Sequence, residues 1–176
     1  MKTLVTGGVR SGKSAHAERL LRTEPFVTYV APGPTTEEDA DPEWAARIAA
    51  HRARRPAGWV TLETRDLARA VCESVAPVLV DCLGTWLSAI LDEAGGWAVP
   101  ADEAARPVEA ALDQFVDALR ASTVDVVTVT NEVGMGIVPE HRSGRLFRDL
   151  LGRINQRVAQ ECDDVLLVVA GRALRL

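Results

Sequence analysis

The stretch TLVTGGVRSGKS, residues Thr3–Ser14, decides the fold of this chain. Its first four residues read as a short buried strand, and the next eight fit the phosphate-binding loop pattern G-x-x-x-x-G-K-[ST] at every fixed position. The glycines let backbone N–H groups turn toward phosphate oxygens, and a helix from Lys13 to about Arg22 points its positive end at the same anion. The alternative is a Gly/Ser turn that matches by chance, which the preceding strand and the following helix disfavour. The stretch predicts a site for a nucleoside triphosphate.

Two side chains of this loop have chemistry that suits a triphosphate. Lys13 supplies a positive charge for the β- and γ-phosphates, and the hydroxyl of Ser14 is a ligand that suits Mg²⁺. We therefore predict Lys13 as a catalytic residue and Ser14 as a metal ligand.

Composition limits the class of protein. The chain has 176 residues, of which 47% are apolar, and a net charge of −5. These values predict a single domain over residues 1–176 and argue against a nucleic-acid partner. No signal peptide or membrane-spanning run is evident, so we expect a cytoplasmic protein without membrane insertion. Three separated cysteines (Cys72, Cys82 and Cys162) read as small buried apolar residues in a reducing compartment.

Strands and helices alternate along the chain. We expect strands at 3–6, 26–31, 59–63, 77–82, 124–130 and 165–170, with 172–176 as an edge strand. Helices are expected at 13–22, 42–55, 65–74, 85–94, 141–161 and in a long segment that ends near 121. Continuous apolar strands separated by helices predict an α/β fold, with a mostly parallel sheet covered by helices on both faces. Ligands of such sheets bind at the carboxyl ends of the strands.

Two further segments contain candidate residues. Val78–Asp81 is an apolar strand that ends in a carboxylate, which in phosphate-loop enzymes holds Mg²⁺, so we predict Asp81 as a second metal ligand. On the helix 42–55, His51 follows Arg47 by one turn and lies near a basic edge. Flanking cations would disfavour the protonated imidazole and keep it nucleophilic. The alternative is a half-buried surface histidine on a basic helix.

Four stretches together resemble one enzyme family. They are Thr6–Ser14, Arg47–Pro56, Trp59–Glu63 and Thr130–Glu140, the last of which reads TNEVGMGIVPE. This set resembles the bifunctional adenosylcobinamide kinase / adenosylcobinamide-phosphate guanylyltransferases of cobalamin biosynthesis, in the order of the family and over nearly the whole chain. The NEVGMGIVP run is far more specific than the phosphate loop.

The resemblance implies two reactions. The γ-phosphate of GTP or ATP passes to a hydroxyl of adenosylcobinamide, and a histidine then attacks the α-phosphate of GTP with release of pyrophosphate. The GMP that the histidine carries is transferred to adenosylcobinamide phosphate. The resemblance also implies a P-loop NTPase fold of the RecA-like type and a homotrimer.

Matching of motifs carries the functional residues of the family onto this chain. His51 corresponds to the nucleophile that forms the GMP-histidine intermediate, which favours the functional interpretation of this residue. The implied nucleotide-binding residues are Gly7, Gly8, Val9, Arg10, Ser11, Gly12, Lys13, Ser14, Ala31, Pro32, Gly33, Arg52, Ala53, Arg54, Arg55, Glu63 and Asp81.

Three positions differ from the usual family pattern. Ala31-Pro32-Gly33 lacks the usual hydroxyl residues, so we expect backbone groups to make that guanosine contact. Asp81 has a shorter reach than the glutamate of some members, and Ala50 replaces a histidine that some relatives carry.

Two other hypotheses compete with the two-step enzyme. A simple P-loop small-molecule kinase would transfer only the γ-phosphate, with His51 incidental. A nucleotide-gated binding protein would show no turnover that depends on a corrinoid.

Overall fold

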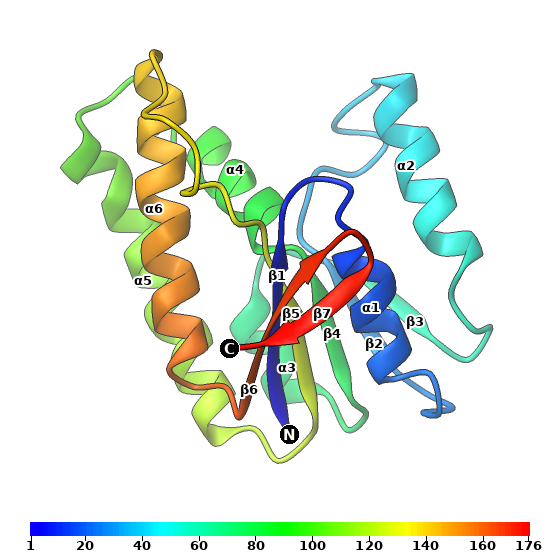
Figure 1. Ribbon diagram of the computed structural model, residues 1–176. Helices are drawn as coiled ribbons and strands as arrows, with labels where there is room; N and C mark the ends of the chain where they lie inside the picture. The colour runs from blue at the N-terminus through cyan, green and yellow to red at the C-terminus, as the bar shows by residue number, and fades with distance from the viewer.

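A seven-stranded sheet forms the centre of the computed structural model, which describes residues 1–176 (Figure 1). Its strands, in chain order, are β1 (Lys2–Gly7), β2 (Thr28–Ala31), β3 (Val60–Glu63), β4 (Val78–Asp81), β5 (Val126–Val129), β6 (Asp164–Val169) and β7 (Arg172–Arg175). The helices are α1 (Lys13–Leu20), α2 (Pro42–Ala53), α3 (Leu67–Glu73), α4 (Leu83–Glu93), α5 (Ala101–Ala121) and α6 (Arg142–Ala159).

The strand order is β3-β2-β4-β5-β1-β6-β7. All neighbouring pairs are parallel except β6 and β7, which are antiparallel because a tight turn joins them. The parallel connections bring the carboxyl ends of β1, β2 and β4 to one edge of the sheet. The loops that follow these strands therefore share one region, as the sequence predicts.

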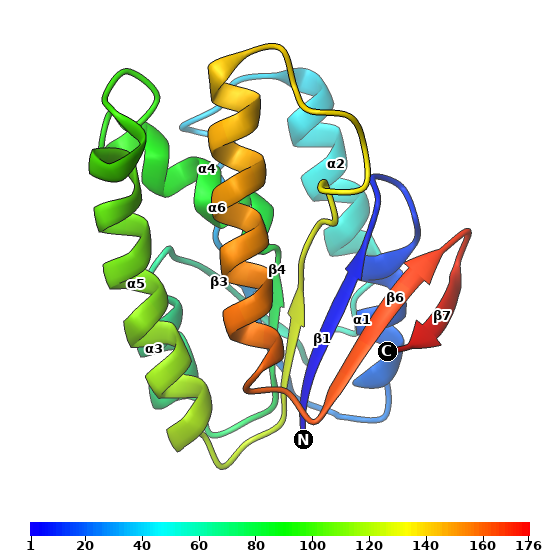
Figure 2. The same ribbon diagram turned by 60° about the vertical axis from the view of Figure 1, so that its left-hand side comes forward.

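Helices cover the two faces of the sheet unequally. The larger apolar core joins α3, α4, α5 and α6 to one face, on which Leu4, Val80 and Val126 lie. A smaller core joins α1 to the other face through Ala17 and Leu21. Figure 2 shows α5 and α6 side by side on the first face and α1 on the second. Helix α2 lies beyond the carboxyl ends of the strands and has no buried residue.

The predicted fold class is confirmed, with corrections at the edges of the sheet and at one cysteine. Strand β7 is exposed throughout, and Val60 and Leu62 of β3 are exposed as well, so helices do not cover the edge strands. Cys72 is exposed, whereas the sequence predicted that it would be buried. It lies on the outward side of α3, whose buried positions are Leu67, Ala70 and Val71.

No helix of the structure combines the length and the apolar composition that a membrane crossing requires.

Substitution of Phe115 by alanine tests the larger core. The Phe115 ring is fully buried and its centroid lies 6.1 Å from that of Trp86. We expect Phe115→Ala to lower the free energy of unfolding by about 3–5 kcal/mol, because it removes buried apolar atoms and leaves a cavity. Urea denaturation measures the change. Val75→Ala, at a position 97% exposed, is the control and should change stability by less than about 0.5 kcal/mol.

Candidate nucleotide site

The loop between β1 and α1 has the backbone geometry of an anion-binding turn. Gly12 has a φ of 92°, in the left-handed region that favours glycine. The amino group of Lys13 donates to the carbonyl oxygen of Gly8 at 3.2 Å. The N-terminus of α1 thus points into the loop, and the Lys13 side chain bends back across the loop. Both features suit the binding of phosphate oxygens. Burial lowers the pKa of Lys13, since it disfavours the charged form.

The turn between β6 and β7 packs against this loop. The N–H of Gly171 donates to the carbonyl oxygen of Ser11 at 2.8 Å. A Cβ atom at Gly12 would lie 3.3 Å from the Cα atom of Gly171, and one at Gly7 would lie 2.5 Å from the carbonyl oxygen of Val168. The second contact is too close for a side chain, so Gly7 is required for packing of the loop against β6.

Three groups from three elements meet at the carboxylate of Asp81. The Ser14 hydroxyl of α1 donates to Oδ1 at 3.2 Å, and the Tyr29 hydroxyl of β2 donates to Oδ2 at 2.8 Å. Nδ1 of His51, on α2, lies 3.5 Å from the same Oδ2. The Asp81 side chain is 7% exposed and the His51 side chain 25% exposed.

These neighbours decide the charge of Asp81. Burial raises the pKa of the carboxyl, but the interactions with His51, Tyr29 and Ser14 outweigh burial and hold it below its ordinary value. Burial, with the nearby carboxylate, also raises the pKa of Tyr29, which therefore stays a hydrogen-bond donor. The structure thus holds a buried carboxylate ion at the end of β4.

Helix α2 is positioned by its ends and by polar contacts. The Asp41 side chain caps its N-terminus by accepting from the N–H of Glu43 at 2.9 Å, and Pro42 follows in the first turn. Arg54 donates to both carboxylate oxygens of Glu18 at 3.0 and 3.1 Å, which ties the end of α2 to α1. This tie explains why His51 faces the P-loop.

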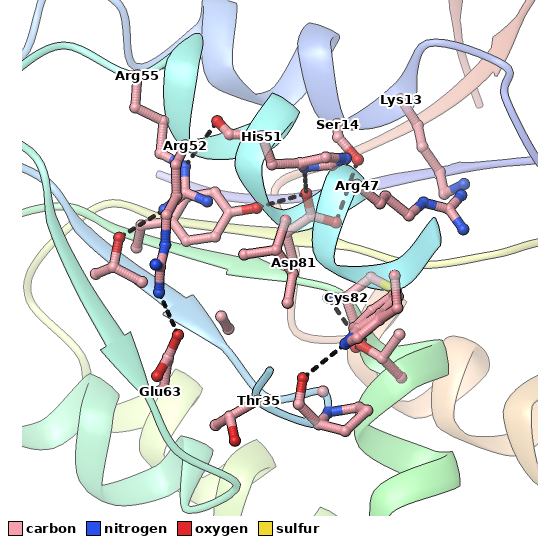
Figure 3. A pocket seen from close by; sticks show the side chains of 18 of the residues that line it. Lys13, Ser14, Thr35, Arg47, His51, Arg52, Arg55, Glu63, Asp81 and Cys82 are labelled. Atoms are coloured by element: carbon pink, nitrogen blue, oxygen red, sulfur yellow. Dashed lines mark hydrogen bonds and ion pairs between the residues drawn. The ribbon is translucent and has the colours of Figure 1, made fainter. Parts of the chain in front are cut away.

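Two cavities meet at His51. The smaller has a volume of about 240 Å³ and extends from the P-loop past Tyr29 and Trp44 to Glu63. The larger and more open one, of about 780 Å³, lies between residues 10–15 and the face of α2 that carries Arg47. Five residues line both cavities: Lys13, Ser14, Trp44, Arg47 and His51. Figure 3 shows His51 next to Asp81 and Ser14, with Arg47 close by.

Two arginines of the α2 end fix the side of the smaller cavity that β2 and β3 form. The guanidinium carbon of Arg55 lies 3.4 Å from the centroid of the Tyr29 ring, a cation–π contact, and Nη1 donates to the Thr61 hydroxyl at 2.6 Å. Arg52 pairs with Glu63 across the entrance. Arg55 and Arg52 therefore link α2 to β2 and β3.

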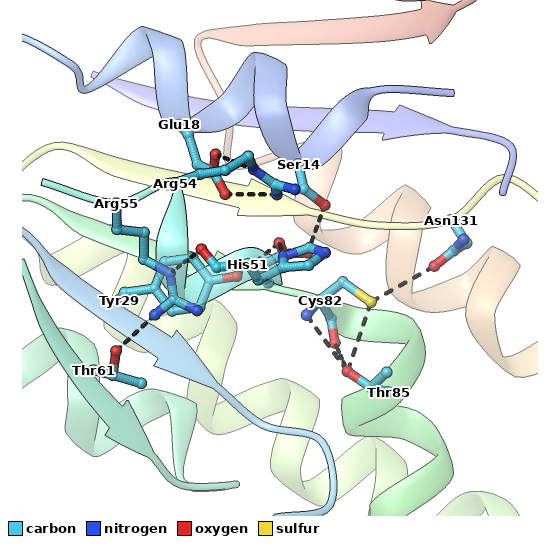
Figure 4. A network of polar contacts seen from close by, with 11 residues as sticks. Ser14, Glu18, Tyr29, His51, Arg54, Arg55, Thr61, Cys82, Thr85 and Asn131 are labelled. Atoms are coloured by element: carbon cyan, nitrogen blue, oxygen red, sulfur yellow. Dashed lines mark hydrogen bonds and ion pairs between the residues drawn. The ribbon is translucent and has the colours of Figure 1, made fainter. Parts of the chain in front are cut away.

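A second polar network lies beside the carboxylate, and Figure 4 shows it together with the first. The Sγ atom of Cys82 lies 3.6 Å from Oγ1 of Thr85 and 3.6 Å from Oδ1 of Asn131. Asn155 donates to the carbonyl oxygen of Asn131 at 3.0 Å. These contacts connect the start of α4 to the loop after β5, so that Cys82, Thr85 and Asn131 line the smaller cavity together.

The structure brings most of the predicted residues together. Among them, Val9, Lys13, Ser14, Ala31, Gly33, His51, Arg52, Arg55, Glu63 and Asp81 line the smaller cavity. Arg10, Ser11, Gly12 and Arg54 line the larger one, which also contacts Lys13, Ser14 and His51. Pro32 is buried, Ala53 is exposed, and neither lines a cavity. Gly7 and Gly8 shape the loop without lining either cavity.

The structure gives His51 a neighbour that the sequence did not predict. The sequence predicted an imidazole flanked by cations, and in the structure the carboxylate of Asp81 also lies 3.5 Å from its Nδ1 atom. Arg47 lines the same cavities, and Arg54 pairs with Glu18 rather than remaining free. The contact arises because strand pairing in the parallel sheet places the end of β4, and so Asp81, next to α2. The spacing of residues along the helix alone does not reveal which strand ends beside it.

Sequence reasoning missed several residues of the site. Tyr29 reads as a core aromatic of a strand, and Trp44 as part of the apolar stripe of α2. Trp44 instead lines both cavities, and its Nε1 atom donates to the carbonyl oxygen of Pro34 at 2.9 Å. The one available signal was that Tyr29 is the single tyrosine of the chain and stands two residues before a predicted nucleotide contact.

Comparison with known proteins decides the family. The family model described as "Cobinamide kinase / cobinamide phosphate guanyltransferase" matches residues 3–176. The chain belongs to this family. It is 44% identical over 184 residues to the bifunctional adenosylcobalamin biosynthesis protein CobU of Salmonella typhimurium, with 100% of this chain and 99% of the relative covered. It is 41% identical over 186 residues to the CobU protein of Escherichia coli, with the same coverage.

The family membership confirms the predicted resemblance and makes the chain a transferase. Pseudomonas aeruginosa has a further relative, the bifunctional protein CobP, which is 36% identical over 181 residues and is covered to 97%. Among solved structures, an ATPase of a bacterial type III secretion system superposes with a TM-score of 0.62 at 10% identity, over 99% of this chain and 56% of that one. That likeness shows the fold, which is the predicted α/β arrangement of a mostly parallel sheet with helices on both faces.

Acid unfolding tests the charge of Asp81. Because the folded-state pKa lies below the ordinary value of 3.8, the carboxylate stabilises the fold above that pH and loses this contribution as pH falls through the folded pKa. Between about pH 5 and pH 2 we expect the unfolding free energy of the wild type to fall more steeply than that of Asp81→Asn. Urea titrations at each pH measure it, with Asp149→Asn, at an exposed position, as the control. Parallel profiles for wild type and Asp81→Asn would contradict the assignment.

Proposed function

We propose that this chain phosphorylates adenosylcobinamide with GTP or ATP and then transfers GMP from GTP to adenosylcobinamide phosphate, with His51 as the group that carries GMP. The observation that supports this proposal best is the position of His51 in the wall shared by the two cavities, one of which is formed by the P-loop. An imidazole at this boundary is within reach of the α-phosphate of a nucleotide whose β- and γ-phosphates lie on the P-loop.

The two cavities divide the nucleotide between them. The P-loop residues 10–14 and the cation Arg47 line the larger cavity, which suits a triphosphate. The smaller cavity holds Glu63, Thr61 and the backbone at Ala31 and Gly33, and it suits a base and ribose. Glu63 has carboxylate oxygens that match the N–H donors of guanine, and its side chain is 38% exposed.

Phosphoryl transfer requires positioning and neutralisation of charge. Lys13 places its ammonium group over the loop, and the backbone N–H groups at the start of α1 complete the cradle. In this step the hydroxyl of adenosylcobinamide attacks the γ-phosphate and the nucleoside diphosphate leaves. The loop after β5, with Met135 and Ile137 exposed, lies beside this region, and we propose it as a corrinoid contact.

Two oxygen donors of the site fit Mg²⁺. The Ser14 hydroxyl and Oδ1 of Asp81 lie 3.2 Å apart and face the P-loop. Mg²⁺ is usually held by one or two such protein groups together with substrate phosphates and water, so this pair suits the ion. When bound, Mg²⁺ would neutralise the charge of the phosphates. The homotrimer and the cytoplasmic location stay predictions.

Transfer of the α-label tests the role of His51. Incubation of the protein with Mg²⁺ and GTP labelled at the α-phosphate should give a protein adduct that is labile to acid and stable to alkali, as expected for a phosphoramidate. His51→Ala should abolish the adduct, because no other histidine lines the cavities. His141→Ala, at an exposed position at the start of α6, is the matched control and should label as the wild type does.

The same variants separate the two reactions. With γ-labelled GTP and adenosylcobinamide, His51→Ala should still form labelled adenosylcobinamide phosphate, whereas Lys13→Ala should lose at least about 100-fold in rate. Label from α-GTP on the His51→Ala protein would refute the role of His51, and transfer from γ-GTP alone in the wild type would leave a simple kinase.

Removal of metal tests the Ser14–Asp81 pair. With EDTA in excess we expect both transfers to fall to background, because charge neutralisation at the phosphates is lost. Added Mg²⁺ should restore them in the wild type. In Asp81→Asn the Mg²⁺ concentration for half-maximal rate should rise by about tenfold or more. An unchanged Mg²⁺ requirement in this variant would exclude Asp81 as a ligand.

A further inference from the structure

The two oxygens of the buried Asp81 carboxylate face different parts of the site. Oδ1 accepts from the Ser14 hydroxyl at 3.2 Å and belongs to the P-loop side. Oδ2 accepts from the Tyr29 hydroxyl at 2.8 Å and lies 3.5 Å from Nδ1 of His51. Nothing in a P-loop kinase requires the second set of contacts, so they call for a separate explanation.

Nδ1 of His51 and Oδ2 of Asp81 are 3.5 Å apart, which is long for a hydrogen bond. Catalytic hydrogen bonds are often long in the free enzyme and shorten in the complex with substrate. A carboxylate only accepts hydrogen bonds, so the ring atom that faces it must carry the proton. When Nδ1 carries the proton of a neutral imidazole, Nε2 has the free lone pair.

We propose that Asp81 is a positioning residue for guanylyl transfer: through Oδ2 it keeps the proton of His51 on Nδ1, so that Nε2 is the atom that bonds to the α-phosphorus, and Tyr29 holds Oδ2 in place. This inference rests on the proposed function of His51. Figure 3 shows the imidazole of His51 beside both Asp81 and Ser14, which are joined to each other by a hydrogen bond, with Arg47 and Lys13 further along the same wall.

The step balances without a further reactant. The Nε2 lone pair forms a bond to the α-phosphorus, and the bond from that phosphorus to the oxygen bridging to the β-phosphorus breaks, so pyrophosphate leaves with the electron pair. The ring keeps its proton on Nδ1 and becomes positive, which the Asp81 carboxylate stabilises. When a phosphate oxygen of adenosylcobinamide phosphate attacks, the N–P bond breaks and Nε2 regains its lone pair.

Tyr29 takes a defined part in this arrangement. Its hydroxyl donates to the same oxygen that faces His51, and the cation of Arg55 stacks on its ring with 3.4 Å between the guanidinium carbon and the ring centroid. Arg55 also donates to the backbone carbonyl of His51 at 3.1 Å. Tyr29 and Arg55 therefore fix both the carboxylate oxygen and the backbone of the residue that it orients.

The nitrogen that carries GMP tests the inference in the wild-type protein. The protein is treated with α-labelled GTP and Mg²⁺, the nucleoside is removed by periodate oxidation and β-elimination, and the protein is hydrolysed in alkali. Chromatography against the two phosphohistidine isomers then identifies the bond. We expect the Nε2 isomer. The Nδ1 isomer would overturn the inference and leave His51 as the GMP carrier, whereas the absence of phosphohistidine would overturn the proposed function itself.

Tyr29→Phe tests whether the two oxygens of the Asp81 carboxylate serve different reactions. The substitution removes the hydroxyl but keeps the ring beneath Arg55. We expect guanylylation of the protein to slow by about 10- to 100-fold, which is the usual effect of removing a residue that orients a functional histidine through a second side chain. Phosphorylation of adenosylcobinamide should slow by a smaller factor than guanylylation, because Ser14 still holds Oδ1. Equal loss of both rates, or no loss of guanylylation, would overturn the role of Tyr29 in holding Oδ2.

Thr28→Val provides the matched control for this variant. Thr28 precedes Tyr29 on β2, and its hydroxyl bonds with that of Ser74 at 3.0 Å, away from both cavities. Removal of this hydroxyl should leave the ratio of the two rates as in the wild type. A ratio that shifts as much as in Tyr29→Phe would show that any hydroxyl lost from β2 has the same effect, and would contradict the specific role of Tyr29.

Discussion

Burial of a carboxylate at the end of β4 is the constraint on which this site depends. Taking the charge of Asp81 out of water costs free energy unless hydrogen-bond donors and opposite charge replace the water. The replacements come from three elements, through Ser14 of α1, Tyr29 of β2 and His51 of α2. Because no single element satisfies the carboxylate, the relative positions of the P-loop helix, the second strand and the histidine helix are coupled through one side chain.

Helix α2 differs from the other helices in how it is held. It has no buried residue, and ion pairs and hydrogen bonds fasten it to its neighbours, among them Arg54 with Glu18 and Arg52 with Glu63. Exposed contacts of this kind contribute little stability, and elements held by them open more readily than packed ones. The helix that carries His51 is thus held mainly by ion pairs and hydrogen bonds rather than by a buried apolar face.

The sequence is informative where the determining pattern is local. The P-loop and the helices predicted at 42–55, at 141–161 and in the segment that ends near 121 depend on neighbours within a few residues, and the structure has them close to where the pattern places them. The contact of His51 with Asp81 depends on the order of strands, which spacing along the chain does not encode. Tyr29 could not be told from a core aromatic for the same reason, since the residue is buried and its contacts with Asp81 and Arg55 depend on how the elements are arranged in space.

The position of β1 in the sheet has a consequence for folding of the chain during translation. This strand, which leads into the P-loop, lies between β5 and β6, and the loop itself leans on Gly171 in the turn after β6. During translation β1 leaves the ribosome long before β5 and β6 are synthesised, so the strand stays unpaired in the nascent chain until then. The P-loop is therefore completed only after β5, β6 and the turn at Gly171 have been synthesised.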